Sequence, residues 1–171
     1  MTIDISPVTT SRTDSLAISC VYGAESRGIF EDCLSGASLS SDVEVSGNVD
    51  DNGGCITLRI RVLFGYTGEC ARCLDPVSGT FDALIERTVC TDTEIPDETD
   101  EDYVSAPDGN LDLDDVILEE LLLTFPTKLL CSETCPGICP KCGKKKMDGE
   151  CGCDKKEIDP RLKILEQLLE K

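Results

Sequence analysis

Residues 56–64 read Ile-Thr-Leu-Arg-Ile-Arg-Val-Leu-Phe, and this stretch decides the fold. Apolar side chains occupy every second position, which is the period expected when one face of a β-strand meets a core. Residues 43–49 form a second extended segment, and the turn-prone Asp-Asp-Asn-Gly-Gly of residues 50–54 joins the two. The sequence therefore predicts a β-hairpin here.

A third strand is predicted at residues 77–90, because apolar residues again share one face. The charged Arg87 is the exception on that face. Its apolar members are Phe81, Ala83, Ile85 and Val89. Together with the hairpin, this strand gives a small antiparallel β-sheet, and the helical patterns that follow it make the fold class α+β.

Residues 113–125 carry the pattern of a helix. Asp112 or Asp114 can cap its first turn, acidic side chains there favour the positive end of the helix dipole, and Pro126 stops it. Apolar residues cover most of its circumference, so we expect a long helix packed on more than one side. They are Val116, Ile117, Leu118, Leu121, Leu122 and Leu123.

Two further segments have clear local signals. Residues 91–109 contain eight acids, no base and two prolines, so charge repulsion and lost backbone donors oppose regular structure and predict a mobile acidic loop. Near the C-terminus, Asp159 and Pro160 predict the start of a short helix. Its apolar stripe consists of Leu162, Leu165, Leu168 and Leu169.

Charge divides the 171 residues into two parts. Residues 1–127 carry 6 basic and 26 acidic side chains, whereas residues 128–171 carry 10 basic and 8 acidic ones. We therefore expect an acidic β-rich body with the long helix, and a Cys/Lys-rich zinc-binding tail with the terminal helix, which can pack as one domain. The body repels phosphate, and only the tail can supply counterion release to a nucleic acid. The excess of acids in the body is explained equally well if it only keeps the protein soluble.

The chain has twelve cysteines in 171 residues, and whether they form disulfides depends on the cellular compartment. The N-terminus lacks the basic and apolar stretches of a signal peptide, and no run approaches the ~20 apolar residues of a membrane span. The sequence therefore predicts a cytoplasmic protein without membrane contact. Its thiols are then reduced, bound to metal or buried.

Six of the cysteines lie in residues 131–153, and a four-thiolate structural zinc site explains them best. The sequence Cys-Pro-Lys-Cys-Gly at residues 139–143 is a zinc knuckle, because Cys-x-x-Cys before a small residue turns two sulfurs toward one ion. The spacing leaves more candidates than four ligands. In order of preference they are Cys139, Cys142 and Cys153, then Cys135 over Cys151, with Cys131 a poorer candidate.

Two other kinds of cysteine chemistry are weaker alternatives for this tail. Free or disulfide-bonded thiols would suit a secreted protein better than a cytoplasmic one. A catalytic zinc needs an open coordination position, but the chain has no histidine, and a four-thiolate shell is closed. We therefore expect neither an enzyme nor a small-molecule substrate.

A second cysteine motif lies at Cys70-Ala-Arg-Cys73. It is interpreted as half of a second metal site, as a redox pair, or as a structural turn. A redox pair normally opens a helix, whose N-terminus lowers the pKa of the first thiol, but here Pro76 and a strand follow. Distant thiols could complete the half-site, namely Cys90, Cys131 or Cys135.

Basic side chains surround the tail cysteines. A zinc-pinned loop that carries them could present cations to an RNA backbone, although a solvated surface that balances nearby acids is an equally good explanation. No aromatic residue is interleaved, so such contacts would involve phosphate and shape. The candidate RNA-contacting residues are Lys141, Lys144, Lys145, Lys146, Lys155 and Lys156.

The order of motifs resembles the bacterial and plastid family of large ribosomal RNA subunit accumulation proteins, called YceD-like. The resemblance covers residues 40–171. The matching pieces are Cys70-Ala-Arg-Cys73-Leu-Asp-Pro76, the leucine-rich 111–126, Cys-Pro-Gly-Ile-Cys-Pro-Lys-Cys-Gly at 135–143, Cys151-Gly-Cys153, and Asp-Pro-Arg-Leu at 159–162.

This resemblance implies a non-catalytic ribosome-assembly factor that supports accumulation or processing of large-subunit (23S) ribosomal RNA. Its implied partners are a precursor of that RNA or a basic ribosomal protein. Some members lack the C-terminal cysteines, and Lys144-Lys-Lys146 stands where Asn often follows the second knuckle cysteine. The alternative function is a thiol redox protein that uses Cys70 and Cys73.

Overall fold

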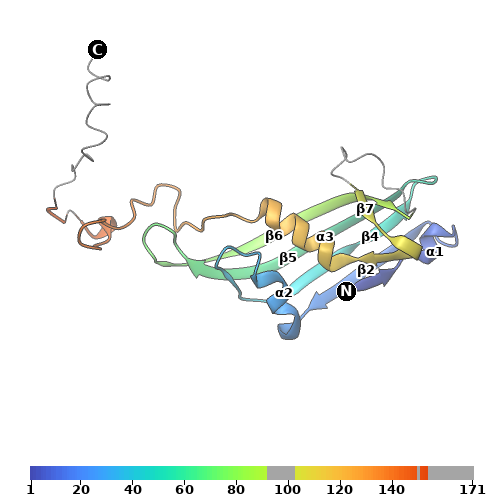
Figure 1. Cartoon of the computed structure of the whole chain (residues 1–171), viewed down its shortest axis with the longest axis horizontal. Helices are drawn as coiled ribbons and strands as arrows, with labels where there is room; N and C mark the ends of the chain where they lie inside the picture. The colour runs from blue at the N-terminus through green and yellow to red at the C-terminus, as the bar shows by residue number, and fades with distance from the viewer. Residues whose placement is uncertain (92–102, 150, 154–171) are drawn as a thin grey trace, which may run out of the picture.

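The computed structural model describes residues 1–91, 103–149 and 151–153. The fold is α+β and consists mostly of one sheet with the strand order β2-β4-β5-β6-β7, in which β3 also pairs with β5 (Figure 1). These strands are β2 (Ser15–Tyr22), β3 (Ser38–Leu39), β4 (Val43–Asp51), β5 (Ile56–Glu69), β6 (Pro76–Cys90) and β7 (Tyr103–Ser105).

A second sheet has two strands. It pairs β1 with β8 in antiparallel register. The short helices precede and follow β2, and the longest helix follows β8. The bounds are β1 (Thr2–Asp4), α1 (Ser6–Thr9), α2 (Arg27–Glu31), β8 (Asn110–Asp112) and α3 (Leu113–Thr124), with single 3-10 turns at Ala24–Ser26, Pro107–Gly109 and Lys146–Asp148.

The predicted hairpin is β4 and β5, which pair from Glu44 opposite Leu63 to Asp51 opposite Ile56. Gly53 and Gly54 in its turn have φ angles of 74° and 97°, which glycine adopts without a steric penalty. The predicted third strand is β6, which pairs with β5 along the full length of β5. The alternation of apolar residues therefore predicted these three strands correctly.

The expectation of a small antiparallel sheet is incomplete in two respects. Residues 1–39, for which the sequence predicted no strand, supply the edge strand β2. In addition, β7 lies parallel to β6, with Thr88 opposite Tyr103. Residues 103–109 of the expected acidic loop are thus partly regular, because β7 gains main-chain hydrogen bonds from the end of β6. Residues 92–102 lie outside the described residues.

Helix α3 begins where the sequence predicted, since the Asp112 carboxylate accepts a hydrogen bond of 3.0 Å from the Asp114 N–H. It has 12 residues, and packing on more than one side is not what the structure shows. Leu122 and Leu123 are 66% and 77% exposed, because the sheet covers only one side of the helix. The buried residues are Leu113, Val116, Ile117 and Leu121. The predicted C-terminal helix lies outside the described residues.

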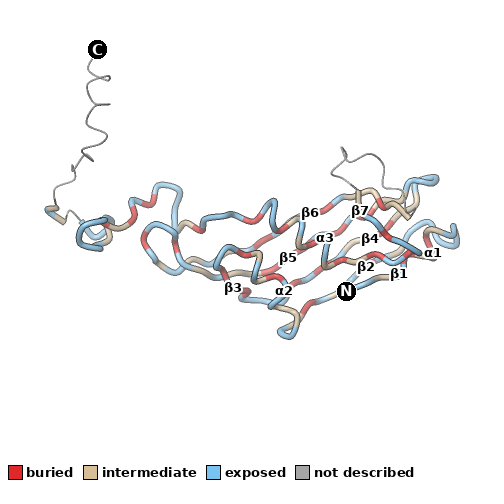
Figure 2. Tube along the Cα trace, in the orientation of Figure 1, coloured by how far each residue is buried: buried red, intermediate tan, exposed pale blue. Residues whose placement is uncertain are grey.

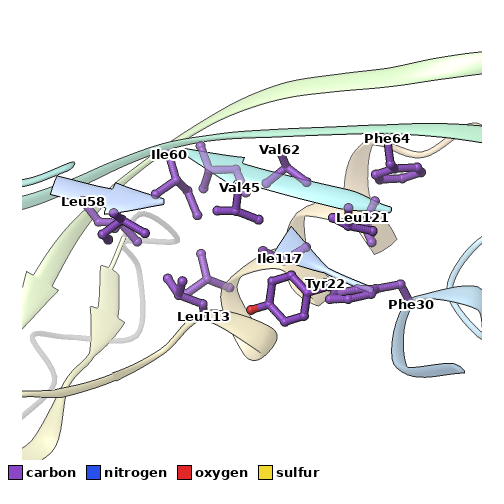
Figure 3. Close-up of a cluster of buried hydrophobic side chains, with 14 of the residues drawn as sticks. Tyr22, Phe30, Val45, Leu58, Ile60, Val62, Phe64, Leu113, Ile117 and Leu121 are labelled. Carbon is purple, nitrogen blue, oxygen red and sulfur yellow. The ribbon is translucent and has the colours of Figure 1, made fainter. Parts of the chain in front are cut away.

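The core lies between α3 and one face of the sheet. Side chains of β4 and β5 point toward α3, and Tyr22 and Phe30 close one side of the cluster with their rings 5.0 Å apart at 87° (Figure 3). Buried positions recur along the strands in this layer (Figure 2). Each fully buried side chain of this size contributes about 1.5–3 kcal/mol. Within the described residues, no helix combines the length and the apolar character that a membrane span requires.

Candidate metal centres

Eight cysteines gather in two groups of four, and within each group all sulfur atoms lie within 4.8 Å of one another. We call them the first and the second cysteine group. The first consists of Cys70, Cys73, Cys131 and Cys135, and the second of Cys139, Cys142, Cys151 and Cys153. The first group forms where the chain beyond α3 runs past the turn between β5 and β6, and the second follows in the tail, at the same end of the molecule (Figure 1).

The sulfur spacing in the first group suits a tetrahedral metal ion. The Cys70 and Cys135 sulfurs are 3.8 Å apart, and those of Cys73 and Cys131 are 3.5 Å apart. A zinc ion with four sulfurs at about 2.3 Å separates neighbouring sulfurs by about 3.8 Å. A disulfide would need about 2.05 Å. The spacing is therefore compatible with four thiolates around one metal ion.

The turn at Cys70–Cys73 directs two sulfurs to one point. The Cys70 N–H donates to the Asp75 carbonyl at 2.8 Å, and the Leu74 N–H donates to the Cys70 carbonyl at 2.9 Å. Leu74 has a φ of 62°, which is unusual for a residue with a side chain. The chain thus reverses tightly between β5 and β6.

The turn at Cys139–Cys142 repeats this geometry. The Cys139 N–H donates to the Lys144 carbonyl at 2.8 Å, and the Gly143 N–H donates to the Cys139 carbonyl at 2.9 Å. Gly143 has a φ of 71° and occupies the place that Leu74 has in the other turn. Two motifs 69 residues apart in the chain therefore adopt the same metal-knuckle conformation.

Replacing Leu74 with glycine is expected to raise the free energy of unfolding by up to about 1 kcal/mol. The left-handed conformation costs a side-chain-bearing residue about 1–2 kcal/mol, and the greater freedom of glycine in the unfolded chain offsets part of the gain. Leu74 is exposed, so little packing is lost. The matched Gly143→Leu variant should lose a similar amount. Urea denaturation at constant metal concentration measures both, and a less stable L74G protein would refute this explanation.

Backbone hydrogen bonds favour the thiolate, metal-binding form at one cysteine of each group. Backbone N–H groups, that of Cys131 first, lower the pKa of Cys70 to about 6. The N–H groups of Cys142 and Lys141 lower the pKa of Cys139 to about 6. In contrast, the neighbouring Cys142 and Cys151 thiols raise the pKa of Cys153 to about 12. A divalent cation would relieve this crowding of thiolates.

The two groups are linked through the segment between Cys135 and Cys139. The Ile138 N–H donates to the Arg72 carbonyl at 3.0 Å. A Cβ atom on Gly137 would lie 2.9 Å from that carbonyl oxygen, so the close approach requires glycine. The tail segment therefore lies directly against the turn between β5 and β6.

Side chains of this turn strengthen the same contact. Arg72 Nη1 donates to the Cys135 carbonyl at 2.9 Å and to the Glu133 carbonyl at 3.1 Å. Asp75 forms an ion pair with Lys145 and accepts a hydrogen bond from the Cys73 thiol at 3.2 Å. The first group thus joins the sheet to the tail, whereas the second lies within the tail.

The structure brings the cysteines together in a different grouping from the one expected from the sequence. Cys135, expected beside the Cys139–Cys142 knuckle, lies in the first group, because the Ile138–Arg72 hydrogen bond holds it against the turn at the end of β5. Cys131, the poorer candidate, lies in the first group as well. Cys151 and Cys153 both join the second group. Of the thiols considered as completing the Cys70/Cys73 half-site, Cys90 lies outside both groups.

The lysines of the tail differ in their surroundings. Lys141, Lys144 and Lys146 are exposed beside the second group. Lys145 is partly buried in its ion pair with Asp75. Lys155 and Lys156 lie outside the described residues.

A family model described as "Large ribosomal RNA subunit accumulation protein YceD" matches residues 58–169. The chain belongs to the YceD family. The matched residues include every cysteine of both groups.

Among curated proteins, this YceD family member is similar to mycobacterial relatives. It is 38% identical over 104 residues to the uncharacterized proteins Rv2926c of Mycobacterium tuberculosis and Mb2951c of Mycobacterium bovis, which covers 60% of this chain and 50% of each relative. It is 28% identical over 112 residues to ML1660 of Mycobacterium leprae, with 63% and 49% covered. The chain thus spans about half the length of these relatives. No solved structure matches it.

Proposed function

We propose that this chain is a zinc-stabilised, non-catalytic factor of ribosome assembly that acts in the cytoplasm and supports the accumulation or processing of large-subunit (23S) ribosomal RNA. The observation that carries the proposal is the YceD family match over residues 58–169, which spans both cysteine groups. The zinc ions would fasten the tail to the sheet and shape the tail for contact with a partner.

The donor chemistry supports zinc as the metal. Each group offers four soft sulfur donors, whereas magnesium and calcium require oxygen donors. Tetrahedral four-sulfur sites suit zinc or iron. Four thiolates also fill the shell of a zinc ion, so no position is left for an activated water and the role would be structural.

The lysines beside the second group support contact with RNA. Lys141, Lys144 and Lys146 extend from a short loop that the metal would hold in one shape. On the sheet, Arg59 and Arg61 form ion pairs with Glu86 and Asp82, and they belong to residues 1–127, in which acids outnumber bases. The tail is therefore the better surface for phosphate groups. The excess of acids in residues 1–127 fits a basic ribosomal protein as a second partner.

Replacing Lys141, Lys144 and Lys146 together with glutamine is expected to weaken binding to a precursor fragment of large-subunit ribosomal RNA at least tenfold at moderate salt. Each lost phosphate contact should also reduce the slope of log affinity against log salt by about 0.7–0.9. Fluorescence anisotropy across a salt series measures both quantities.

The matched control is Arg59→Gln with Arg61→Gln, which removes two cations from the sheet and should leave RNA affinity within about twofold. Equal losses of RNA affinity in the two variants would show that affinity depends on the overall charge of the protein and not on contacts of the tail lysines. If the unaltered protein binds neither precursor RNA nor basic ribosomal proteins, the proposed function is wrong.

The thiol redox alternative is less well supported by the geometry. The Cys70–Cys73 turn leads into β6 and not into a helix, so the helix dipole that activates a redox thiol is missing from this motif. Cys131 and Cys135 also lie within metal-sharing distance of both sulfurs. Turnover in a disulfide-reduction assay that disappears in the Cys70→Ser variant would favour the redox alternative.

A further inference from the structure

Strand β2 forms one edge of the main sheet (Figure 1). It pairs with β4 from Ser15 opposite Asp50 to Tyr22 opposite Val43. Its outer side receives no main-chain hydrogen bond from any other described residue, since β1 pairs with β8 instead. A row of backbone donors and acceptors along this eight-residue strand is therefore available.

The sequence of β2 lacks the features that normally protect an edge strand. It reads Ser-Leu-Ala-Ile-Ser-Cys-Val-Tyr, without a charge, proline or glycine. Its pairing with β4 is continuous, so no bulge turns it away. The opposite border of the sheet is different, because β6 carries Asp82 and Glu86 and is partly covered by β7. β2 is thus suited to the addition of another strand.

The surroundings of β2 indicate the charge of that strand. Asp14 precedes it and Glu25 follows it in sequence. On β4, Asp50 lies opposite Ser15, which donates a hydrogen bond to it at 2.6 Å. Glu44 lies opposite Val21. Two acids thus lie near each end of an uncharged strand, against Arg12 at one end and Arg27, which is paired with Asp42, at the other.

This arrangement disfavours a second copy of the chain as the occupant. Two β2 strands in antiparallel register would bring the acidic ends of one copy against those of the other, and each copy carries a net charge of −18. A basic strand, in contrast, would be attracted by the acids that repel a second copy.

We infer that β2 binds an extended basic segment of a partner protein by strand addition. Main-chain hydrogen bonds provide the affinity, and lysine or arginine near the ends of the added strand meets the flanking acids. The centre of the added strand should be uncharged and rich in β-forming residues, because it would lie beside the uncharged side chains of β2. One of these, Val21, is 63% exposed on the open face of the sheet. The inference depends on β2 alone and not on RNA binding or on metal.

The test uses the full chain and a synthetic peptide with alternating valine and threonine at its centre and two lysines at each end. Amide hydrogen exchange by NMR should show at least tenfold slower exchange at alternate residues of 15–22 when the peptide is bound. Ala17→Lys with Ser19→Lys should weaken the peptide at least tenfold, because these exposed positions would then repel it.

The control is Leu84→Lys, which should leave peptide affinity within about twofold. Leu84 lies in the same cross-strand row as Ser19, through Ser46 and Arg61, and is 71% exposed. The inference is overturned if the slower exchange maps to residues outside β2, or if a peptide with glutamates at its ends binds equally well. It is also overturned if raising the protein concentration without peptide slows exchange in β2, because the occupant would then be a second copy of the chain.

Discussion

The Cys70→Ser variant is expected to retain about one metal ion per chain where the unaltered protein holds about two, and to unfold at a clearly lower temperature. Cys70 is completely buried in the first group, which joins the turn after β5 to residues 131–135. Structural zinc contributes about 10–16 kcal/mol in small peptides, and that binding energy is folding energy where the ligands lie. Elemental analysis and calorimetry measure the two effects.

The matched variant is Cys139→Ser, which should also lose one metal ion but leave the unfolding temperature of the sheet nearly unchanged. All ligands of the second group lie in the tail, so its loss unfolds the tail locally. The exposed, isolated Cys55 provides a control for thiol removal, and Cys55→Ser should change neither quantity. Equal destabilisation by Cys70→Ser and Cys139→Ser would show that the first group does not fasten the tail to the sheet.

The Phe64→Ala variant is expected to lower the free energy of unfolding by about 3–5 kcal/mol, because it leaves a cavity in the centre of the core. Phe64 is 1% exposed and stacks on Phe81 with the ring centroids 4.9 Å apart. Its side chain lies near Leu121 of α3 (Figure 3). Since domains of this size have total stabilities of about 5–15 kcal/mol, this loss is large.

Urea denaturation followed by circular dichroism measures this loss. The control is Leu84→Ala, on the open face of the same sheet, which should cost less than about 0.5 kcal/mol because the side chain is exposed. The metal content of folded Phe64→Ala protein should be unchanged. A cost below about 1 kcal/mol for Phe64→Ala would mean that the sheet and α3 do not pack through this residue.

The strands β4, β5 and β6 could be predicted because each carries a local pattern of period two and a turn signal lies between β4 and β5. Strand β7 could not. Its three residues, Tyr103–Ser105, follow a run of acids, and their pairing with the end of β6 is a parallel contact that no local pattern specifies. Strand β2 has a suitable alternation, but its partner β4 lies more than twenty residues further along the chain.

The position of α3 could be predicted, but its exposed side could not. The cap at Asp112 and the stop at Pro126 are local signals. Which leucines are buried depends on where the sheet lies. Leu121 faces the core, whereas Leu122 and Leu123 face away from it, and six apolar residues around the helix contain no information on that choice.

The cysteine knuckles could be recognised from spacing, whereas the division of ligands between two groups depends on tertiary structure. Cys131 and Cys135 are separated by three residues, a spacing compatible with zinc. Their partners became evident only once the turn after β5 was placed beside them. The close contact at Gly137 and the hydrogen bonds of Arg72 create that neighbourhood.

The most direct test of the two metal centres is elemental analysis of the reduced full chain, combined with thiol alkylation. We expect two zinc ions per chain. Cys131 and Cys142 are exposed, yet metal should protect them from alkylation until a chelator is added, while Cys55, which is also exposed, reacts throughout. One metal ion or none, or a Cys131 thiol that reacts as fast as Cys55 in the metal-loaded protein, would contradict the presence of a zinc site that joins the sheet to the tail.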